Sequence, residues 1–268
     1  MIIGNREFST KDKCYIMGIL NLTPDSFSDG GKWMEIDDAL SHVDKMVSEG
    51  ADIIDIGGES TRPGYRSISE AEEIERVVPI IEAVKERFNI PISIDTYKSR
   101  VAEAALSAGA DMINDIWGLK RDPRMAPLIA KSGVACCLMQ NRVEIDYRDF
   151  IPDLLDDLKE SVQIALHANI AKDKIILDPG VGFAFSHEMN LMAINKLDMI
   201  KKLGYPVLLG ASRKSVIGKV LDSHVSDRLE GTLATTVIAV MRGCTFVRVH
   251  DVRESKRVIM MTEAIIYS

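Results

Sequence analysis

The sequence has few cysteines and no long apolar run, and each shortage excludes a class of protein. The four cysteines are Cys14, Cys136, Cys137 and Cys244. Their spacing is not that of metal ligands, so it predicts buried, reduced thiols. No apolar stretch approaches the roughly 18 residues of a membrane-spanning helix, and no signal peptide is recognisable. We therefore expect a cytoplasmic protein without a membrane partner.

An excess of basic residues is also missing. The 33 lysines and arginines are outnumbered by 40 acidic residues, which leaves a formal charge of −7. This balance gives no support for a nucleic-acid partner, although a local basic cluster could still hold a small anion. The 268 residues are 46% hydrophobic and contain no linker or low-complexity segment. We expect one domain over residues 1–268 with one large core.

The chain does contain an apolar run of strand length that recurs eight times, with amphipathic helical patterns between the runs. Strands and helices that alternate over about 250 residues are typical of a single (β/α)8 TIM barrel, an α/β fold. Gly4 and Asn5 predict a turn in a short N-terminal hairpin that covers the barrel bottom. The eight predicted strands are 15–21, 51–57, 91–96, 112–116, 134–139, 174–180, 206–212 and 246–252.

The clearest helical pattern covers residues 74–88. Ser69 and Glu72 before it form a plausible capping box. Pro79 lies inside the pattern, and since proline removes a helical hydrogen bond, it predicts an end or a kink.

The last strand predicts which side chains enter the barrel. Alternation places Phe246, Arg248 and His250 on one face, and Val247 and Val249 on the other. The valines suit the helix layer, so the two basic groups point into the carboxyl-terminal mouth, where barrel enzymes keep their active sites.

The same alternation directs polar side chains from four other strands into this mouth. They are Asp55, Asp95, Asn114 and Asp178. Because buried carboxylates are rare unless paired, this gathering indicates a polar ligand. The alternative is a structural salt-bridge network with Arg248 and Lys214.

Three loops carry residues that suit an anionic ligand. Asn21 ends the first strand and could hold Mg²⁺ beside a phosphate group, or could be a turn residue. Residues 57–64 surround Arg62 with hydroxyls and glycines, which suits phosphate oxygens. Residues 210–215 join a strand to a helix start, a common anion site in barrels, although Ser212 could be only a helix cap.

Eight segments in this order closely resemble the dihydropteroate synthase family over nearly the whole chain. They are GILNLTPDSFSDGG (18–31), DIIDIGGESTRPG (52–64), ISIDTYKS (92–99), MINDI (112–116), ILDPGVGF (176–183), LLGASRKSVIG (208–218), RLEGTLAT (228–235) and FVRVHDV (246–252). This family condenses 6-hydroxymethyl-7,8-dihydropterin diphosphate with 4-aminobenzoate and releases diphosphate. The resemblance implies these two small-molecule substrates, Mg²⁺ as cofactor and a homodimer.

The resemblance also implies roles for individual residues. The pterin-binding set is Asp95, Asn114, Met139, Asp178, Phe183, Gly210 and Lys214. Asn21 would hold Mg²⁺, and the diphosphate would bind Asn21, Thr61, Arg62, Arg248 and His250. The aminobenzoate pocket would contain Phe27, Thr61, Pro63 and Ser215. The implied catalytic residues are Asp25, which would face the developing cation, with Arg62, Lys214, Arg248 and His250.

Two positions depart from the family pattern. Gln140 stands where many members have histidine, and Phe185 where many have lysine. Two other functions share the fold: a pterin-binding methyltransferase, which would not need the diphosphate residues, and a non-catalytic pterin-binding homologue. A third possibility concerns His250 alone, which beside Asp251 could be structural rather than a ligand contact.

Overall fold

Eight parallel strands close into a barrel in the computed structural model, which describes residues 1–22, 32–60 and 67–268. The strand order is β8-β7-β6-β5-β4-β3-β10-β9. Leu177 pairs with Val207 and donates its N–H to the carbonyl of Pro206, which joins β8 to β9. The predicted TIM barrel is therefore confirmed. The strands are β3 (Tyr15–Asn21), β4 (Ile53–Gly57), β5 (Ile92–Asp95), β6 (Met112–Asp115), β7 (Ala135–Met139), β8 (Ile175–Asp178), β9 (Leu208–Leu209) and β10 (Phe246–Val249).

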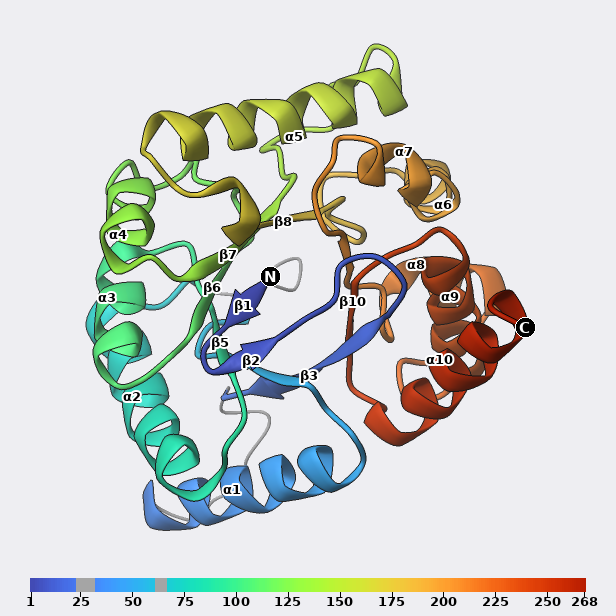
Figure 1. The fold of residues 1–268 in the computed structure, drawn as a ribbon. Coiled ribbons are helices and arrows are strands. Elements are labelled where there is room, and N and C mark those ends of the chain that lie inside the picture. The colour runs from blue at the N-terminus through green and yellow to red at the C-terminus, as the bar shows by residue number, and fades with distance from the viewer. Residues whose placement is uncertain (23–31, 61–66) are drawn as a thin grey trace.

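Helices surround the sheet as a ring (Figure 1). They are α1 (Lys32–Ser48), α2 (Glu70–Arg87), α3 (Ser99–Ser107), α4 (Met125–Ser132), α5 (Phe150–His167), α6 (His187–Asn195), α7 (Leu197–Lys201), α8 (Ser215–Leu221), α9 (Leu229–Met241) and α10 (Val252–Ile266), with a 3-10 turn at Lys172–Lys174.

Helix α2 begins where its sequence predicts but does not end at its proline. The Ser69 hydroxyl accepts the N–H of Glu72 at 3.2 Å, as the capping pattern predicts. The helix runs on through Pro79 to Arg87, so an end at Pro79 is wrong. Val77, Ile81 and the rest of its apolar face are buried on both sides of the proline, and this burial outweighs the lost hydrogen bond.

The predicted hairpin closes the amino-terminal end of the barrel. Strands β1 (Ile2–Ile3) and β2 (Arg6–Glu7) pair antiparallel and lie across the centre of the helix ring (Figure 1). The ring of Phe8 packs against Tyr15 at 4.9 Å and Phe246 at 5.6 Å between centroids. This end of the barrel is therefore filled by apolar groups.

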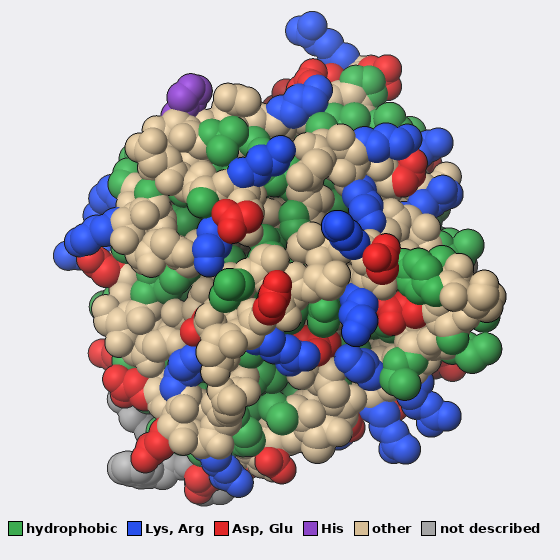
Figure 2. Space-filling view, viewed as in Figure 1, with side chains coloured by type: hydrophobic (Ala, Val, Ile, Leu, Met, Phe, Trp, Pro, Cys, Tyr) green, Lys and Arg blue, Asp and Glu red, His purple; other side chains and the backbone are tan. Residues whose placement is uncertain are grey.

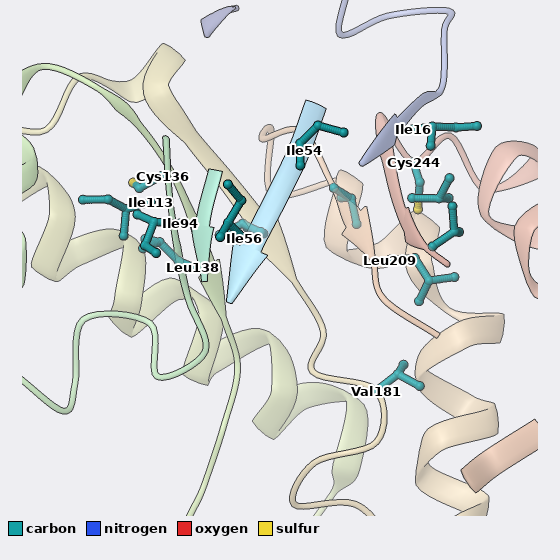
Figure 3. Close-up of a cluster of buried hydrophobic side chains, with 14 of the residues drawn as sticks. Ile16, Ile54, Ile56, Ile94, Ile113, Cys136, Leu138, Val181, Leu209 and Cys244 are labelled. Atoms are coloured by element: carbon teal, nitrogen blue, oxygen red, sulfur yellow. The ribbon is translucent and has the colours of Figure 1, made fainter. Parts of the chain in front are cut away.

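Side-chain alternation divides the buried residues into two cores. Met17, Ile53 and Phe246 lie inside the barrel with the hairpin residues. Val247 and Val249 belong to the outer core between sheet and helices, as predicted. Figure 3 shows outer-core side chains such as Ile54, Ile94 and Leu138. All four cysteines are buried and unbonded, which confirms the thiol prediction.

The surface around the hairpin carries interspersed basic and acidic side chains (Figure 2). Among the helices that the structure describes, none has the length and apolar character needed to cross a membrane.

Candidate active site

Five strands deliver polar side chains to the carboxyl-terminal mouth of the barrel. Arg248 donates from Nε to Asp55 Oδ2 at 2.5 Å and from Nη2 to Asp95 Oδ2 at 2.7 Å. Asn114 donates from Nδ2 to Asp55 Oδ2 at 3.3 Å. Asp178 is the last residue of β8. The gathering that strand alternation predicts is therefore present.

A salt-bridge network, the alternative interpretation, accounts for only part of this gathering. Arg248 pairs with two carboxylates, as that interpretation requires. However, Asp55 Oδ1 and Asp95 Oδ1 are buried and have no hydrogen-bond partner in the described part of the chain. Lys214 donates from Nζ to the backbone carbonyl of Val181 instead of to a carboxylate. Since buried acceptors are normally satisfied, the remaining oxygens fit a ligand that brings donors.

Burial shifts the protonation of these groups toward neutral forms. It raises the pKa of Asp95 to about 7, although Arg248 opposes the shift, and it raises the pKa of Asp178 against the charge of Lys214. Burial lowers the pKa of Lys214 to about 8. Burial also lowers the pKa of Arg248, but Asp55 and Asp95 more than compensate and raise it overall. Near neutral pH, Asp95 and Lys214 can therefore change charge when a ligand binds.

The loop after β8 and the loop after β9 meet at Lys214. Its Nζ lies 4.7 Å from the centroid of the Phe183 ring. Gly182 has φ of 89°, and a Cβ there would lie 2.6 Å from Lys214 Cδ. A Cβ on Gly210 would lie 3.7 Å from Asp178 Oδ2 and 3.8 Å from Lys214 Nζ. These predicted pterin residues thus share one side of the mouth.

Met139 completes this side. It is buried at the end of β7 and is the register partner of Asp178.

His250 is tied to the loop after β9. Its Nδ1 lies 3.0 Å from Ser212 Oγ, and its backbone N–H donates to the same oxygen at 3.2 Å. A helix cap at Ser212 is therefore wrong, because Lys214 precedes α8 and makes no side-chain cap. Asp251 binds Arg213, which has a positive φ of 56°. The contact between Nδ1 and Ser212 therefore gives His250 a structural role at this ring nitrogen.

The remaining predicted residues lie at the rim. Asn21 ends β3, and a Cβ on Gly57 would lie 3.9 Å from Asn21 Oδ1 and 3.7 Å from Asp95 Oδ2, so this glycine leaves space between them. Ser215 is exposed at the first turn of α8. Five predicted residues lie outside the described residues: Asp25, Phe27, Thr61, Arg62 and Pro63.

Sequence reasoning missed a buried lysine that ties together the chain on both sides of residues 61–66. Lys98 donates from Nζ to Glu59 at 2.5 Å, to Glu73 at 2.7 Å and to the carbonyl of Ile68 at 2.9 Å. Glu59 also accepts the N–H of Ile68 at 3.0 Å. The apolar pattern of α2 gives no signal for the burial of Glu73, because charged residues of an amphipathic helix ordinarily lie on its solvated face.

The two departures from the family pattern lie in one cluster. Gln140 is fully buried and donates to Tyr147 Oη at 2.5 Å and Asp157 Oδ2 at 3.1 Å. The Phe185 ring packs edge-on against Tyr147 at 5.7 Å and Phe150 at 4.9 Å. Gln140 and Phe185 therefore both contact Tyr147. This shared contact explains why the two departures from the family pattern occur together.

Comparisons with known proteins agree with this geometry. A family model described as pterin binding enzyme matches residues 17–250. A dihydropteroate synthase of Clostridium beijerinckii is 58% identical over 267 residues, 99% of each chain. A crystal structure of dihydropteroate synthase from Clostridium difficile in the presence of pteroic acid has a TM-score of 0.95 at 49% identity and covers 98% of this chain and 100% of that one. A Yersinia pestis dihydropteroate synthase with a sulfonamide drug complex has a TM-score of 0.93 at 38% identity, over 100% and 99% of the two chains. The chain belongs to the pterin-binding enzyme family, as a transferase of the dihydropteroate synthase type that acts in folate biosynthesis.

Proposed function

We propose that the polar side chains at the carboxyl-terminal mouth of the barrel bind the pterin ring of 6-hydroxymethyl-7,8-dihydropterin diphosphate. The observation that carries this proposal is a set of acceptors near the donor Lys214, namely the buried Asp178 and Asn114 and the buried Oδ1 atom of Asp95. The amino and ring N–H groups of a pterin need acceptors, and its carbonyl needs a donor. Phe183, Met139 and Gly210 would line the flat slot around the ring.

The leaving diphosphate would lie next to the bound pterin ring, near Arg248, His250 and Arg62. Breaking the bond between the pterin methylene carbon and oxygen leaves the electron pair on diphosphate and positive charge on the methylene. Preorganised cations would stabilise the first charge, and Asp25 would face the second. The arylamine nitrogen of 4-aminobenzoate would then bond to the methylene and lose a proton. No nucleophilic serine or cysteine is needed.

The residues at the rim fit a Mg²⁺ ion that is held mainly by substrate. Asn21 offers one neutral oxygen beside the space left by Gly57. In the described part of the chain no group of three or more His, Cys, Asp or Glu side chains could hold a metal. A sparse protein shell suits Mg²⁺ bound through phosphate and water. The ion would stabilise the negative charge of the departing diphosphate.

A diphosphate-release assay with pterin diphosphate tests the proposal. We expect release that depends on 4-aminobenzoate and stops in excess EDTA. Asn21→Ala should raise the Mg²⁺ concentration that half-maximal release requires. Full turnover in EDTA would refute the metal assignment, as would tight Mg²⁺ binding by the free protein that Asn21→Ala leaves unchanged.

The aminobenzoate pocket would be formed by Phe27, Thr61, Pro63 and Ser215 and would accept sulfonamides. The solved structure of the Yersinia pestis enzyme with a sulfonamide drug complex supports this proposal. Sulfonamides should compete with 4-aminobenzoate and bind more tightly when pterin and diphosphate are present. Noncompetitive inhibition would contradict the shared pocket, and an affinity that ignores pterin and diphosphate would contradict ordered assembly.

We also propose that the chain works as a homodimer in the cytoplasm. Helices α8, α9 and α10 lie together on one side of the barrel (Figure 1). Residues 231–241 of α9 carry no charge, and Met241, Met261 and Ile265 are each more than 60% exposed. A second copy would cover these groups.

Sedimentation of Met261→Glu tests the dimer surface. We expect a monomer at concentrations where the natural chain is dimeric. The control is Val143→Glu, which changes a side chain 80% exposed in the loop after β7 and should leave the dimer intact. A natural chain that sediments as a monomer would refute the dimer. Cell fractionation tests the cytoplasmic location.

A further inference from the structure

Asp55 is the most deeply buried charged group at the barrel mouth, and none of the roles above uses it. Its side chain has no exposed surface. One oxygen, Oδ2, accepts both Arg248 Nε at 2.5 Å and Asn114 Nδ2 at 3.3 Å. It therefore connects two residues that face the proposed ligand from different strands.

These two bonds determine what each partner can offer to a ligand. A carboxylate accepts hydrogen bonds but donates none. The Asn114 amide must therefore turn its Nδ2 toward Asp55, which leaves its Oδ1 free to accept a donor on the other side. Arg248 uses Nε on Asp55 and one N–H of Nη2 on Asp95, so both N–H groups of Nη1 and the second one of Nη2 remain for another group.

Stability alone does not explain a carboxylate at this position. Asp55 Oδ1 is buried without a hydrogen-bond partner among the residues that the structure describes. Burying a charge is costly, and an oxygen left unpaired adds to that cost. Asp52, near the start of the same strand, shows a satisfied arrangement, because both of its oxygens are bonded.

We propose that Asp55 is a positioning residue that orients the Asn114 amide and the Arg248 guanidinium for binding of the pterin substrate. The proposal rests on the proposed roles of Asn114 and Arg248. The effect of Asp55 on the substrate would be exerted through these two partners, to which its Oδ2 is bonded.

A second consequence concerns the protonation of Asp95. Asp95 is faced by Arg248 from β10, Asp55 from β4, Glu73 from α2 and Lys214 after β9. Burial raises the pKa of Asp95 most, and the charge of Asp55 raises it further against Arg248. Removing the Asp55 charge should therefore lower the pKa of Asp95. A carboxylate that is not among the charges acting on Asp95, such as Asp52, would not move this pKa.

Calorimetric binding of pteroate, a product analogue, tests the proposal. We expect Asp55→Asn to weaken binding about 10-fold or more, since it weakens two oriented hydrogen bonds. The acid limb of the binding profile should also move to lower pH. The matched control, Asp52→Asn, should leave both the affinity and the pH profile unchanged.

Double variants separate the positioning role from a general loss of structure. In an Asn114→Ala background, Asp55→Asn should reduce pteroate affinity by a smaller factor than it does alone, because the partner of Asp55 is already absent. Exchanging the pair as Asp55→Asn with Asn114→Asp should bind pteroate more tightly than Asn114→Asp alone, which places two carboxylates together. This exchange is informative even if Asp55→Asn alone folds poorly.

Three results would overturn the proposal: natural affinity in Asp55→Asn, fully multiplicative losses in the double variant, or no gain on exchange. Natural affinity in both Asn114→Ala and Arg248→Ala would instead refute the pterin roles on which the proposal rests.

Discussion

Buried aspartates at the two ends of the barrel differ in how completely their carboxylate oxygens are hydrogen-bonded. At the amino-terminal end, Asp52 Oδ1 accepts Arg6 Nη2 at 2.5 Å, and Oδ2 accepts the N–H of Ile16 at 2.9 Å and Lys256 Nζ at 3.3 Å. At the mouth, three residues along the chain, Asp55 leaves one oxygen unpaired. Asp52 therefore has both oxygens hydrogen-bonded and stabilises the fold, whereas the buried oxygen of Asp55, unpaired among the described residues, costs stability.

The same contrast extends to the surroundings. Phe8, Tyr15 and Phe246 fill the amino-terminal end with apolar contacts. The mouth instead collects groups with shifted pKa values, among them Asp95 and Lys214. A barrel can lose favourable interactions at one end because the other end and the helix layer supply its stability. This separation yields predictions that differ for the two ends.

The largest expected effect is the loss of pterin binding in Asp178→Asn. Asp178 Oδ1 accepts the N–H of Gly180 at 2.7 Å, so the other oxygen is available to a ligand. Asparagine would present a donor to the donors of the pterin, at a cost of about 3 kcal/mol, or roughly 100-fold in affinity. Calorimetry with pteroate measures this loss, and thermal unfolding should remain near that of the natural chain. Nearly natural affinity would refute the assignment of Asp178.

The opposite result is expected at the other end. Asp52→Asn should lower the free energy of unfolding by about 1 to 3 kcal/mol, because it weakens bonds to Arg6, Lys256 and the N–H of Ile16. Pteroate affinity should not change. Denaturant titration and calorimetry measure the two quantities. A variant that loses affinity while it keeps its stability would contradict the division between the ends.

Arg248→Ala sharpens the comparison within the mouth. Its proposed partner is the leaving group, so pterin diphosphate should lose about 10-fold more affinity than plain pterin. Arg62→Ala should likewise weaken the binding of pterin diphosphate far more than that of plain pterin. Competition binding with both ligands gives the ratio. Equal losses would mean that Arg248 acts only through Asp55 and Asp95.

The smallest effect concerns pH. The folded pKa of Asp95, about 7, is above its ordinary value of 3.8, so the folded chain binds the extra proton. Stability from this group is therefore present below pH 3.8 and lost as pH rises to about 7, whereas pteroate binding should improve over the same range. Melting temperatures of the natural chain and Asp95→Asn from pH 4 to 7 should diverge accordingly. A constant difference would show that Asp95 does not titrate there.

The sequence by itself was sufficient to predict much of the mouth. Alternation along β10 correctly separated Phe246 and Arg248 from Val247 and Val249, because strand geometry has a period of two that needs no tertiary information. The same local rule placed Asp55, Asp95 and Asn114 inward. The family resemblance then supplied the reaction, which comparison with relatives supports.

Tertiary structure decided which of these inward groups bind one another. The bond from Arg248 to Asp55 spans 193 residues, and that from Ser212 to His250 spans 38. Pro79 was misjudged for the same reason, since the burial that carries α2 through it comes from neighbouring elements. Periodicity depends on the local backbone, whereas pairing and burial depend on how the barrel closes, so only the folded chain could show that Asp52 is satisfied and Asp55 is not.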